Sequence, residues 1–262
     1  MKLFAAKNSV RVTGTCCLTL VAAVLAILAA GATVHASTTD SRIESAAKDS
    51  YVFKTYLKDD DIKVNSVDGV VTLTGTVEQE THKALAKVTV EGLPGVTSVE
   101  NKIELKGERP PENSDTWVMT KVKTTLLFHR SVSGFKTEVD VKDGIVTLKG
   151  EATSQAQKDL TTEYAKDVEG VKDVKNEMVV STPKEKSRTV GEKIDDASIT
   201  AQAKMTLLYH RSTSGLKTSV KTKDGVVTLS GKAKNATEKD LATKFVNDVH
   251  GVKSVKNVMT VE

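Results

Sequence analysis

One block of sequence occurs three times in this chain, and the three copies align without a gap. An Asp-Gly pair marks each copy, and the pairs are 75 and then 81 positions apart: Asp68-Gly69, Asp143-Gly144 and Asp224-Gly225. An asparagine repeats both offsets: Asn101, Asn176 and Asn257. The repeating units cover residues 40–106, 115–181 and 196–262, with linkers at 107–114 and 182–195. A fixed period of this kind indicates an array of small modules and not one large core.

Residues 1–36 have the pattern of an export signal: a positively charged start, an apolar run at 16–30, and small residues up to Ala36. We expect cleavage after Ala36, because the apolar run is shorter than the 18 or so residues that a spanning helix needs. Both cysteines of the chain, Cys16 and Cys17, fall inside this signal. The mature chain is therefore predicted to have no disulfide, no lipid-bearing cysteine and no thiolate metal site.

Each unit combines helical and strand periodicities in the same order. Apolar residues four apart, such as Val118, Val122 and Leu126, indicate one face of a first helix. Two alternating runs around the Asp-Gly pair are typical of a β-hairpin, and a second helical stripe and a last apolar strand follow. The order predicts an α+β fold: three tandem αββαβ modules, each with two helices packed on one face of a small three-stranded mixed sheet.

Two glycines recur in each predicted hairpin. Those of the Asp-Gly pairs are predicted to form the turns, since glycine tolerates a positive φ: Gly69, Gly144 and Gly225. Three others fall on the inward face of the following strand: Gly75, Gly150 and Gly231. There we expect the missing side chain to let a helix approach the sheet closely.

The repeated frame is Val-x-x-x-Asp-Gly-(Val/Ile)-Val-Thr-Leu-x-Gly, then a helix, then Gly-Val-x-x-Val-x-Asn. This frame resembles the BON domain, and it is complete three times, at residues 64–101, 139–176 and 220–257. The resemblance implies a module of bacterial osmotically inducible periplasmic and envelope proteins. It also implies binding of phospholipid or other envelope components, with a chaperone-like role as the alternative. It supplies no catalytic residue.

Charge is distributed unevenly over the units, whose formal net charges are −3, −1 and +5 in chain order. The third unit is therefore the one expected to meet an anionic surface, and the acidic first unit could face it within the chain or between chains. The second and third units share a segment, 125–137 and 206–218, that agrees at 10 of 13 positions. We predict an anion or lipid-headgroup site where the first helix of each unit ends, formed by His129, Arg130, Lys136, His210, Arg211 and Lys217.

A structural interpretation of the same segments competes with the anion site. Cations near the end of a helix complement its dipole, Gly134 and Gly215 can serve as left-handed caps, and the apolar neighbours can belong to the core.

No constellation for catalysis or for a cofactor stands out. The run Asp59–Asp61 lacks the spaced ligands of a calcium loop, and His82 and His250 have no repeated partner. The serines near the histidines lack a recurring third group, and aromatic residues, 4% of the chain, are too few for stacking on nucleic acid. We therefore expect no enzymatic activity, no metal, no cofactor and no nucleic-acid partner.

Two functions remain from the sequence. The first is an exported, periplasmic binding protein that docks on anionic phospholipid or envelope components and supports envelope integrity under osmotic stress. The alternative is a soluble chaperone-like protein that acts on envelope proteins.

Overall fold

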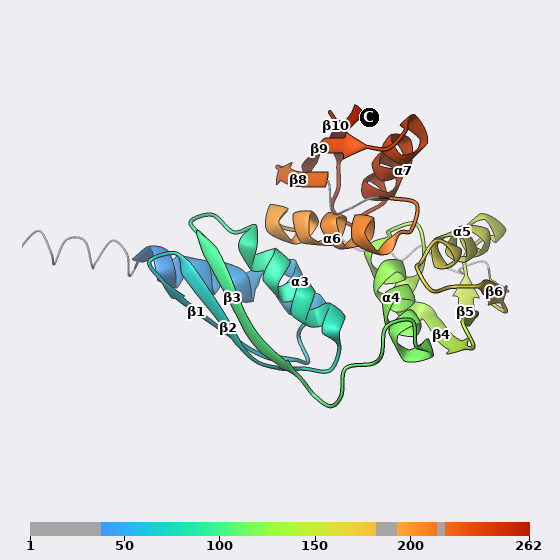
Figure 1. The fold of residues 1–262 in the computed structure, drawn as a ribbon, viewed down its shortest axis with the longest axis horizontal. Coiled ribbons are helices and arrows are strands. Elements are labelled where there is room, and N and C mark those ends of the chain that lie inside the picture. Colours follow the sequence, from blue (N-terminus) through green and yellow to red (C-terminus); the bar gives the residue numbers. More distant parts are fainter. Residues whose placement is uncertain (1–37, 182–192, 214–217) are drawn as a thin grey trace, which may run out of the picture.

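The structure is a computed structural model, and it describes residues 38–181, 193–213 and 218–262. The predicted export signal and most of the second linker lie outside the described residues. Within them, the predicted α+β organisation is confirmed, with the order αββαβ in each of three modules, which we call repeats 1, 2 and 3 (Figure 1).

The elements of the three repeats correspond. Repeat 1 consists of a helix over 38–49, α2 (Tyr51–Thr55), β1 (Asp61–Val67), β2 (Val70–Val77), α3 (Glu80–Glu91) and β3 (Ser98–Leu105). Repeat 2 consists of α4 (Asp115–Phe128), a short 3-10 helix η1 (Gly134–Lys136), β4 (Thr137–Lys142), β5 (Ile145–Ala152), α5 (Gln155–Lys166), β6 (Asp173–Asn176) and β7 (Val179–Val180). Repeat 3 consists of α6 (Asp196–Tyr209), β8 (Thr218–Lys223), β9 (Val226–Ala233), α7 (Ala236–Asn247), β10 (Ser254–Asn257) and β11 (Thr260–Val261).

The central strand of each sheet is the second strand of the hairpin. In repeat 1, β2 pairs antiparallel with β1 and parallel with β3. Repeats 2 and 3 have the same topology around β5 and β9, with the last strand divided into two short pieces. The helices cover one face of each sheet, so the other face remains open.

An aspartate in the first helix of each repeat holds the hairpin turn. In repeat 2, Asp143 and Gly144 both have positive φ, and their N–H groups donate to the carboxylate of Asp115 at 2.8 and 2.9 Å. Asp40 and Asp196 accept the same pair of bonds in the other repeats. Each hairpin is therefore fixed to its helix by hydrogen bonds as well as by apolar packing.

The element that lies close to the inward glycine of each central strand is not the one we predicted. A Cβ on Gly75 would lie 1.8 Å from the carbonyl oxygen of Asp61, and one on Gly150 would lie 2.3 Å from that of Lys136. Both glycines have positive φ. The close approach is made by the paired strand and not by a helix, so the helix-approach prediction was wrong.

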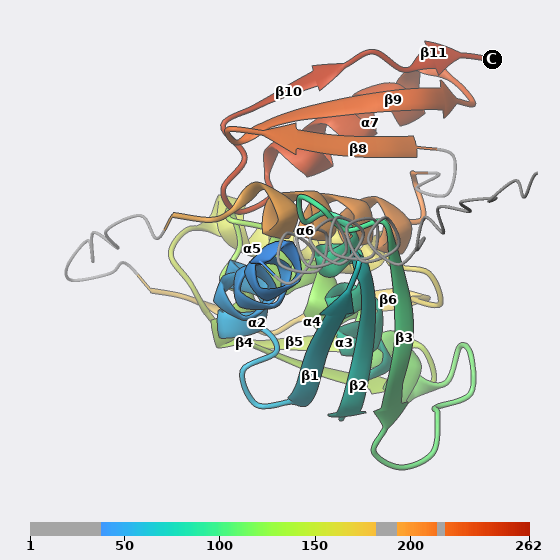
Figure 2. The same cartoon turned by 90° about the vertical axis from the view of Figure 1, so that its left-hand side faces the viewer.

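Helix α6 belongs to two hydrophobic cores at once. One stripe packs on its own sheet through Ile199, Ala203 and Leu207. A second stripe lies in the core of repeat 1: Ala197, Ala201, Met205 and Tyr209. A helix that is apolar on opposite sides is buried from both. Figures 1 and 2 show α6 between the sheet of repeat 3 and the other two repeats.

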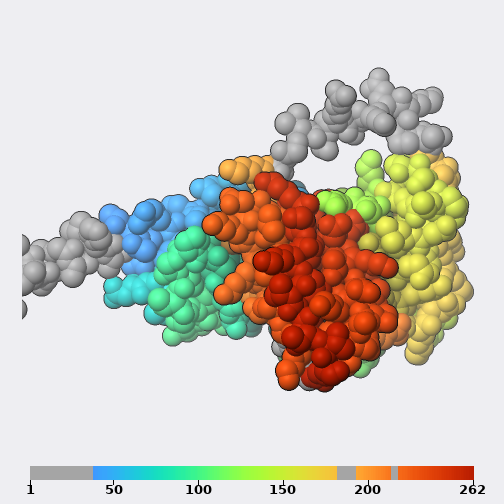
Figure 3. All heavy atoms as spheres, turned by 90° about the horizontal axis from the view of Figure 1, so that it is seen from above, coloured from blue at the N-terminus to red at the C-terminus, as the bar shows by residue number. Residues whose placement is uncertain are grey.

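Hydrogen bonds strengthen the contact between repeat 1 and α6. Asp195 caps α6 by accepting from the N–H of Ser198, and its second oxygen accepts from the N–H of Tyr51 at 2.8 Å. Ser198 accepts from the N–H of Val52 at 3.1 Å. Repeats 1 and 3 do meet, through apolar packing and through hydrogen bonds from backbone N–H groups to side chains; within the described parts of the two repeats, no ion pair joins them. Figure 3, seen from above, shows repeat 3, in orange and red, in front of the other two, with repeat 1 on its left and repeat 2 on its right.

Ala201→Glu tests whether α6 ties the repeats together. Ala201 is fully buried in the core of repeat 1, so a glutamate there is an uncompensated buried charge. We expect the free energy of unfolding, measured by urea denaturation, to fall by about 4 kcal/mol. Leu208→Glu, at a 45% exposed position of the same helix, is the matched control and should change it by less than about 1 kcal/mol. Equal effects of the two substitutions would contradict the shared core.

Candidate functional site

The two predicted histidines lie where α4 and α6 end, and there they meet each other. His129 and His210 follow directly on the last helical residues, and their side chains are 0% and 1% exposed. Their Nε2 atoms are 3.0 Å apart. Two imidazole nitrogens attract at that distance only when one proton lies between them. We call this contact and the residues around it the histidine junction.

Each histidine faces an aspartate of the other repeat. Nδ1 of His210 lies 3.0 Å from Oδ2 of Asp167, and Nδ1 of His129 lies 3.3 Å from Oδ2 of Asp248, the latter falling short of hydrogen-bond geometry. The rings also stack within their own repeats, His129 on Tyr164 and His210 on Phe245, with centroids 3.9 Å apart in both cases. The arrangement is nearly symmetric about an axis between repeats 2 and 3.

The predicted arginines take part in the same junction. The backbone N–H of Arg130 donates to the carbonyl of Asp248 at 2.8 Å, and that of Arg211 donates to the carbonyl of Asp167 at 2.7 Å. Their guanidinium groups donate to the carbonyl oxygens of Val252 and Lys166 respectively. The two predicted histidines and the two predicted arginines therefore join repeat 2 to repeat 3.

The lysines of the predicted site do not join this cluster. Lys136 lies in η1, where it is exposed, beside Phe135, whose ring stacks on Tyr56 of repeat 1 at a centroid distance of 6.0 Å. Lys217 lies outside the described residues. Gly134 begins η1 without a positive φ, so it is not the left-handed cap that we considered. Anion binding by the six residues stays a prediction, but neither histidine offers exposed surface to a ligand.

The junction sets the protonation of its aspartates. Burial by itself raises the pKa of Asp248, but the adjacent imidazole of His129 and hydrogen bonds from Ser131 and Tyr164 outweigh burial and hold that pKa below its usual value. The pKa of Asp167 is lowered against burial in the same way, by His210 and Ser212. Both carboxylates are thus kept charged.

The pKa of His129 is lowered as well, but here burial is the main cause. Burial lowers its pKa to about 4, and repulsion from His210 adds to that effect, while Asp248 opposes it. His129 is thus held neutral at neutral pH, so one of its two ring nitrogens can accept a hydrogen bond.

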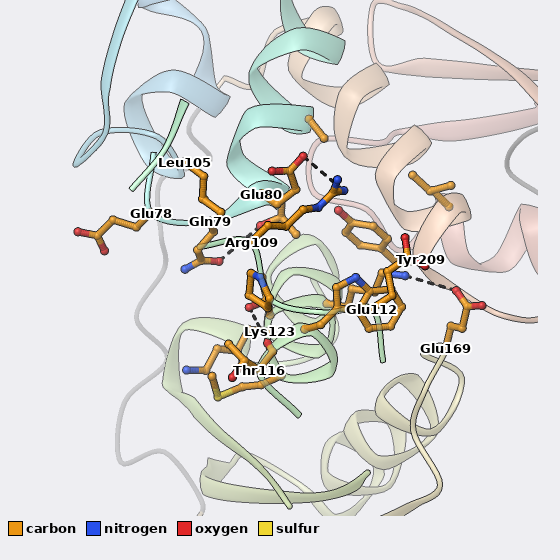
Figure 4. A pocket seen from close by; sticks show the side chains of 18 of the residues that line it. Glu78, Gln79, Glu80, Leu105, Arg109, Glu112, Thr116, Lys123, Glu169 and Tyr209 are labelled. Carbon is orange, nitrogen blue, oxygen red and sulfur yellow. Dashed lines mark hydrogen bonds and ion pairs between the residues drawn. The ribbon is translucent and has the colours of Figure 1, made fainter. Parts of the chain in front are cut away.

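A cavity of about 650 Å³ lies where all three repeats meet. We call it the junction pocket. Repeat 1 and the first linker contribute Glu78–Thr81, Leu105, Arg109 and Glu112; repeat 2 contributes residues of α4 with Glu169; repeat 3 contributes Leu208 and Tyr209. Figure 4 shows the Glu80–Arg109 ion pair on one side and Glu169 on the other, with Tyr209 between them.

A lysine stands inside this pocket against two aromatic rings. Nζ of Lys121 lies 3.4 Å from the centroid of the Trp117 ring, 5.5 Å from that of Tyr209, and 3.4 Å from Oε2 of Glu169. Burial lowers the pKa of Lys121, and Glu169 and Glu112 act against that shift. The pocket therefore already holds an ammonium group in an aromatic and carboxylate setting.

Sequence reasoning missed the pocket and the partners of the histidines. Asp167 and Asp248 are far from the histidines along the chain, so no local spacing connects them. His82, for which the sequence offered no repeated partner, has its Nδ1 2.7 Å from Oδ2 of Asp60. A signal for the pocket existed in Trp117, the single tryptophan of the chain, which has no aromatic counterpart in the other repeats.

No metal cluster of three or more ligating side chains occurs among the described residues. In the same part of the chain, no helix combines the length and apolarity needed to cross a membrane.

The family-level comparison agrees with the repeats. The model of the BON domain matches three times, at residues 39–107, 114–182 and 195–262. These matches cover most of the chain, so the chain belongs to the BON domain family.

Relatives support this placement. The chain is 36% identical over 143 residues to Osmotically-inducible protein Y of Escherichia coli (strain K12), which is 53% of this chain and 71% of that protein. It is 33% identical over 116 residues to the 21 kDa hemolysin of Actinobacillus pleuropneumoniae, which is 43% of this chain and 59% of the hemolysin, less than two thirds of its length.

Among solved structures, CdsD, a structural protein of the type III secretion system of Chlamydia trachomatis, aligns with 15% identity. The alignment covers 88% of this chain and 92% of that one, with a TM-score of 0.23. A score that low carries no argument about arrangement or function.

The histidine junction predicts acid sensitivity. Because the pKa of His129 falls from about 6.5 in the unfolded chain to about 4 in the folded one, the folded protein binds fewer protons between those values. The stabilisation that depends on this lowered pKa of His129 is fully present above pH 6.5. It is lost as the pH falls to 4, when the free energy of unfolding has decreased by about 3 kcal/mol. Urea denaturation between pH 4 and 7 measures this loss.

His129→Phe keeps a ring on Tyr164 but removes the titrating group. We expect the variant to be less stable at pH 7 and to show a flatter dependence on pH between 6.5 and 4. Parallel pH curves for the variant and the unsubstituted chain would show that His129 is not the cause.

Proposed function

We propose that this chain is a non-enzymatic binding protein of the bacterial envelope, exported to the periplasm, that docks on anionic phospholipid. We further propose that it supports envelope integrity under osmotic stress. Membership of the BON domain family and the similarity to an osmotically inducible protein support the setting. The observation that carries the proposal is the open face of the sheet of repeat 3, which we call the lysine face.

The lysine face carries positive charges, and its strands contain no acidic residue to balance them. Four exposed lysines lie on β8, β9 and β10: Lys221, Lys223, Lys232 and Lys256. No aspartate or glutamate occurs in strands β8 to β11. No ion pair of these lysines occurs among the described residues. Figure 2 shows β8, β9 and β10 in front of α7, so this face is turned away from the helix.

Strand register brings the lysines onto the same side as hydroxyl groups. Lys221 and Lys256 both pair with Thr228, one from each side of the central strand. Thr228 is on the open face because its neighbours Val227 and Leu229 are fully buried under the helices. Exposed Val226 and Val258 add apolar surface, with 39% and 48% exposure. A flat face of lysines, hydroxyls and small apolar groups suits a headgroup layer.

The corresponding faces of the other repeats are not cationic. Repeat 2 has Asp140 and Glu151 where repeat 3 has Lys221 and Lys232, and its strands also carry Glu138. Strand β3 of repeat 1 carries two glutamates. Near an anionic membrane each lysine contributes about 1 kcal/mol, so the four together account for a measurable affinity.

Vesicle sedimentation tests the lysine face. Residues 37–262 should bind vesicles containing anionic phospholipid, should not bind purely zwitterionic vesicles, and should bind less as salt screens the charges. Lys221→Asp combined with Lys232→Glu gives repeat 3 the residues of repeat 2. We expect this variant to bind at least tenfold more weakly, since it changes the charge of the face by four units.

The matched control reverses two lysines on the open face of repeat 2, Lys149→Glu with Lys175→Asp. It changes the net charge equally but should retain most of the binding. Equal losses in both variants would indicate general charge attraction and contradict a dedicated face. Absence of binding to every vesicle would reject lipid docking and favour a protein-directed, chaperone-like role. His210 and Arg211 are unsuitable for this test because their loss disturbs the histidine junction.

A further inference from the structure

We propose that the junction pocket is a binding site for an alkylammonium group, and that Lys121 of the chain itself occupies the site in this structure. The ligand class is an ammonium on an apolar stem, either as a free molecule or as the lysine side chain of a peptide. This site is separate from the lysine face and does not rest on lipid docking.

The charges of the pocket favour a cation. Its lining has five glutamates and three basic residues. Two of the basic residues are in ion pairs, Arg109 with Glu80 at 3.6 Å and Lys121 with Glu169 at 3.4 Å. Three carboxylates remain outside these ion pairs, those of Glu78, Glu108 and Glu112, against the single ammonium of Lys123. An anionic ligand would meet net repulsion here.

The aromatic walls favour the same class. The face of a tryptophan ring attracts an ammonium through its quadrupole, and the attraction grows when water is excluded. Lys121 demonstrates the contact, because its ammonium stands 3.4 Å from the centroid of Trp117 while its side chain is only 16% exposed. Leu105, Met119 and Leu208 add apolar wall that can accept a stem.

The framework of the repeat does not require these residues. At the positions of Trp117, Lys121 and Glu169, repeat 3 has Ser198, Gln202 and His250. Repeat 1 has Arg42, Ala46 and Pro94 there. The three therefore form a feature of repeat 2 alone, placed where all three repeats meet, and stability of the fold does not explain their combination.

An external ammonium must compete with Lys121 for the Trp117 ring and for Glu169. Removing the charge of Lys121 should therefore strengthen binding, which is the opposite of what an anion site predicts. Lys121→Met retains an apolar stem over the ring, so packing is conserved. Lys121→Gln is a second variant that also removes the charge while keeping a polar end.

The test uses the fluorescence of Trp117, the single tryptophan of the chain, during titration of residues 37–262. The probes are choline and its neutral isostere 3,3-dimethyl-1-butanol. A second arm uses Nα-acetyl-lysine amide with and without an Nε-acetyl group, which distinguishes a free ammonium from a lysine side chain. Phosphate serves as the anionic probe.

We expect at least one cationic probe to bind and its neutral counterpart to bind at least tenfold more weakly. Lys121→Met and Lys121→Gln should bind the cation about tenfold more tightly than the unsubstituted chain. Lys123→Met removes a lining lysine that is not on the ring, and it should change affinity less than threefold. Equal binding of neutral and cationic probes would overturn the proposal. So would phosphate binding that the Lys121 variants abolish, or no binding of any cation to any variant.

Discussion

The structure depends on a single helix that is buried from two sides. Helix α6 closes the core of its own repeat with one stripe and fills the core of repeat 1 with the opposite stripe. Modules of this size bury little apolar surface and are only marginally stable alone, and sharing a helix adds buried area. Repeat 2 is added through the histidine junction and through Phe128, which reaches the core of repeat 1. Three copies of one fold thereby become a single body with unequal surfaces.

This assembly decides which charged residues are free to act. The His-Arg segments that repeats 2 and 3 share lie where those repeats meet, with both histidines buried against aspartates of the opposite repeat. The surplus positive charge of repeat 3 is instead displayed on its open sheet face. Two glutamates of repeat 1, Glu78 and Glu80, line the junction pocket beside Trp117, together with Glu108 and Glu112 of the first linker. Divergence among the repeats, and not the frame that they share, gives the molecule its distinct surfaces.

Much of the fold could be predicted because each repeat forms through contacts close in sequence. Apolar periods of four and two predicted the order αββαβ, and the family resemblance is confirmed by the three matches. The role of α6 had a signal that we did not use: it has Ala201 and Met205 where α4 has Thr120 and Thr124, so its second stripe is apolar. The pairing of His129 with Asp248 had none, because it depends on how two repeats dock. The close approach at Gly75 was assigned to the wrong neighbour, since a pattern shows an inward position but not what lies opposite.

The most direct test asks which sheet faces the membrane. Thr72, Thr147 and Thr228 hold the same outward position on the central strands of the three sheets, and no cysteine follows Cys17 in the chain. A single cysteine at each threonine, labelled with an environment-sensitive fluorophore, can be quenched by quencher-bearing lipid in anionic vesicles. The account predicts quenching of the label at position 228 and not of those at 72 and 147. Equal quenching at all three positions, or quenching confined to 72 or 147, would contradict it.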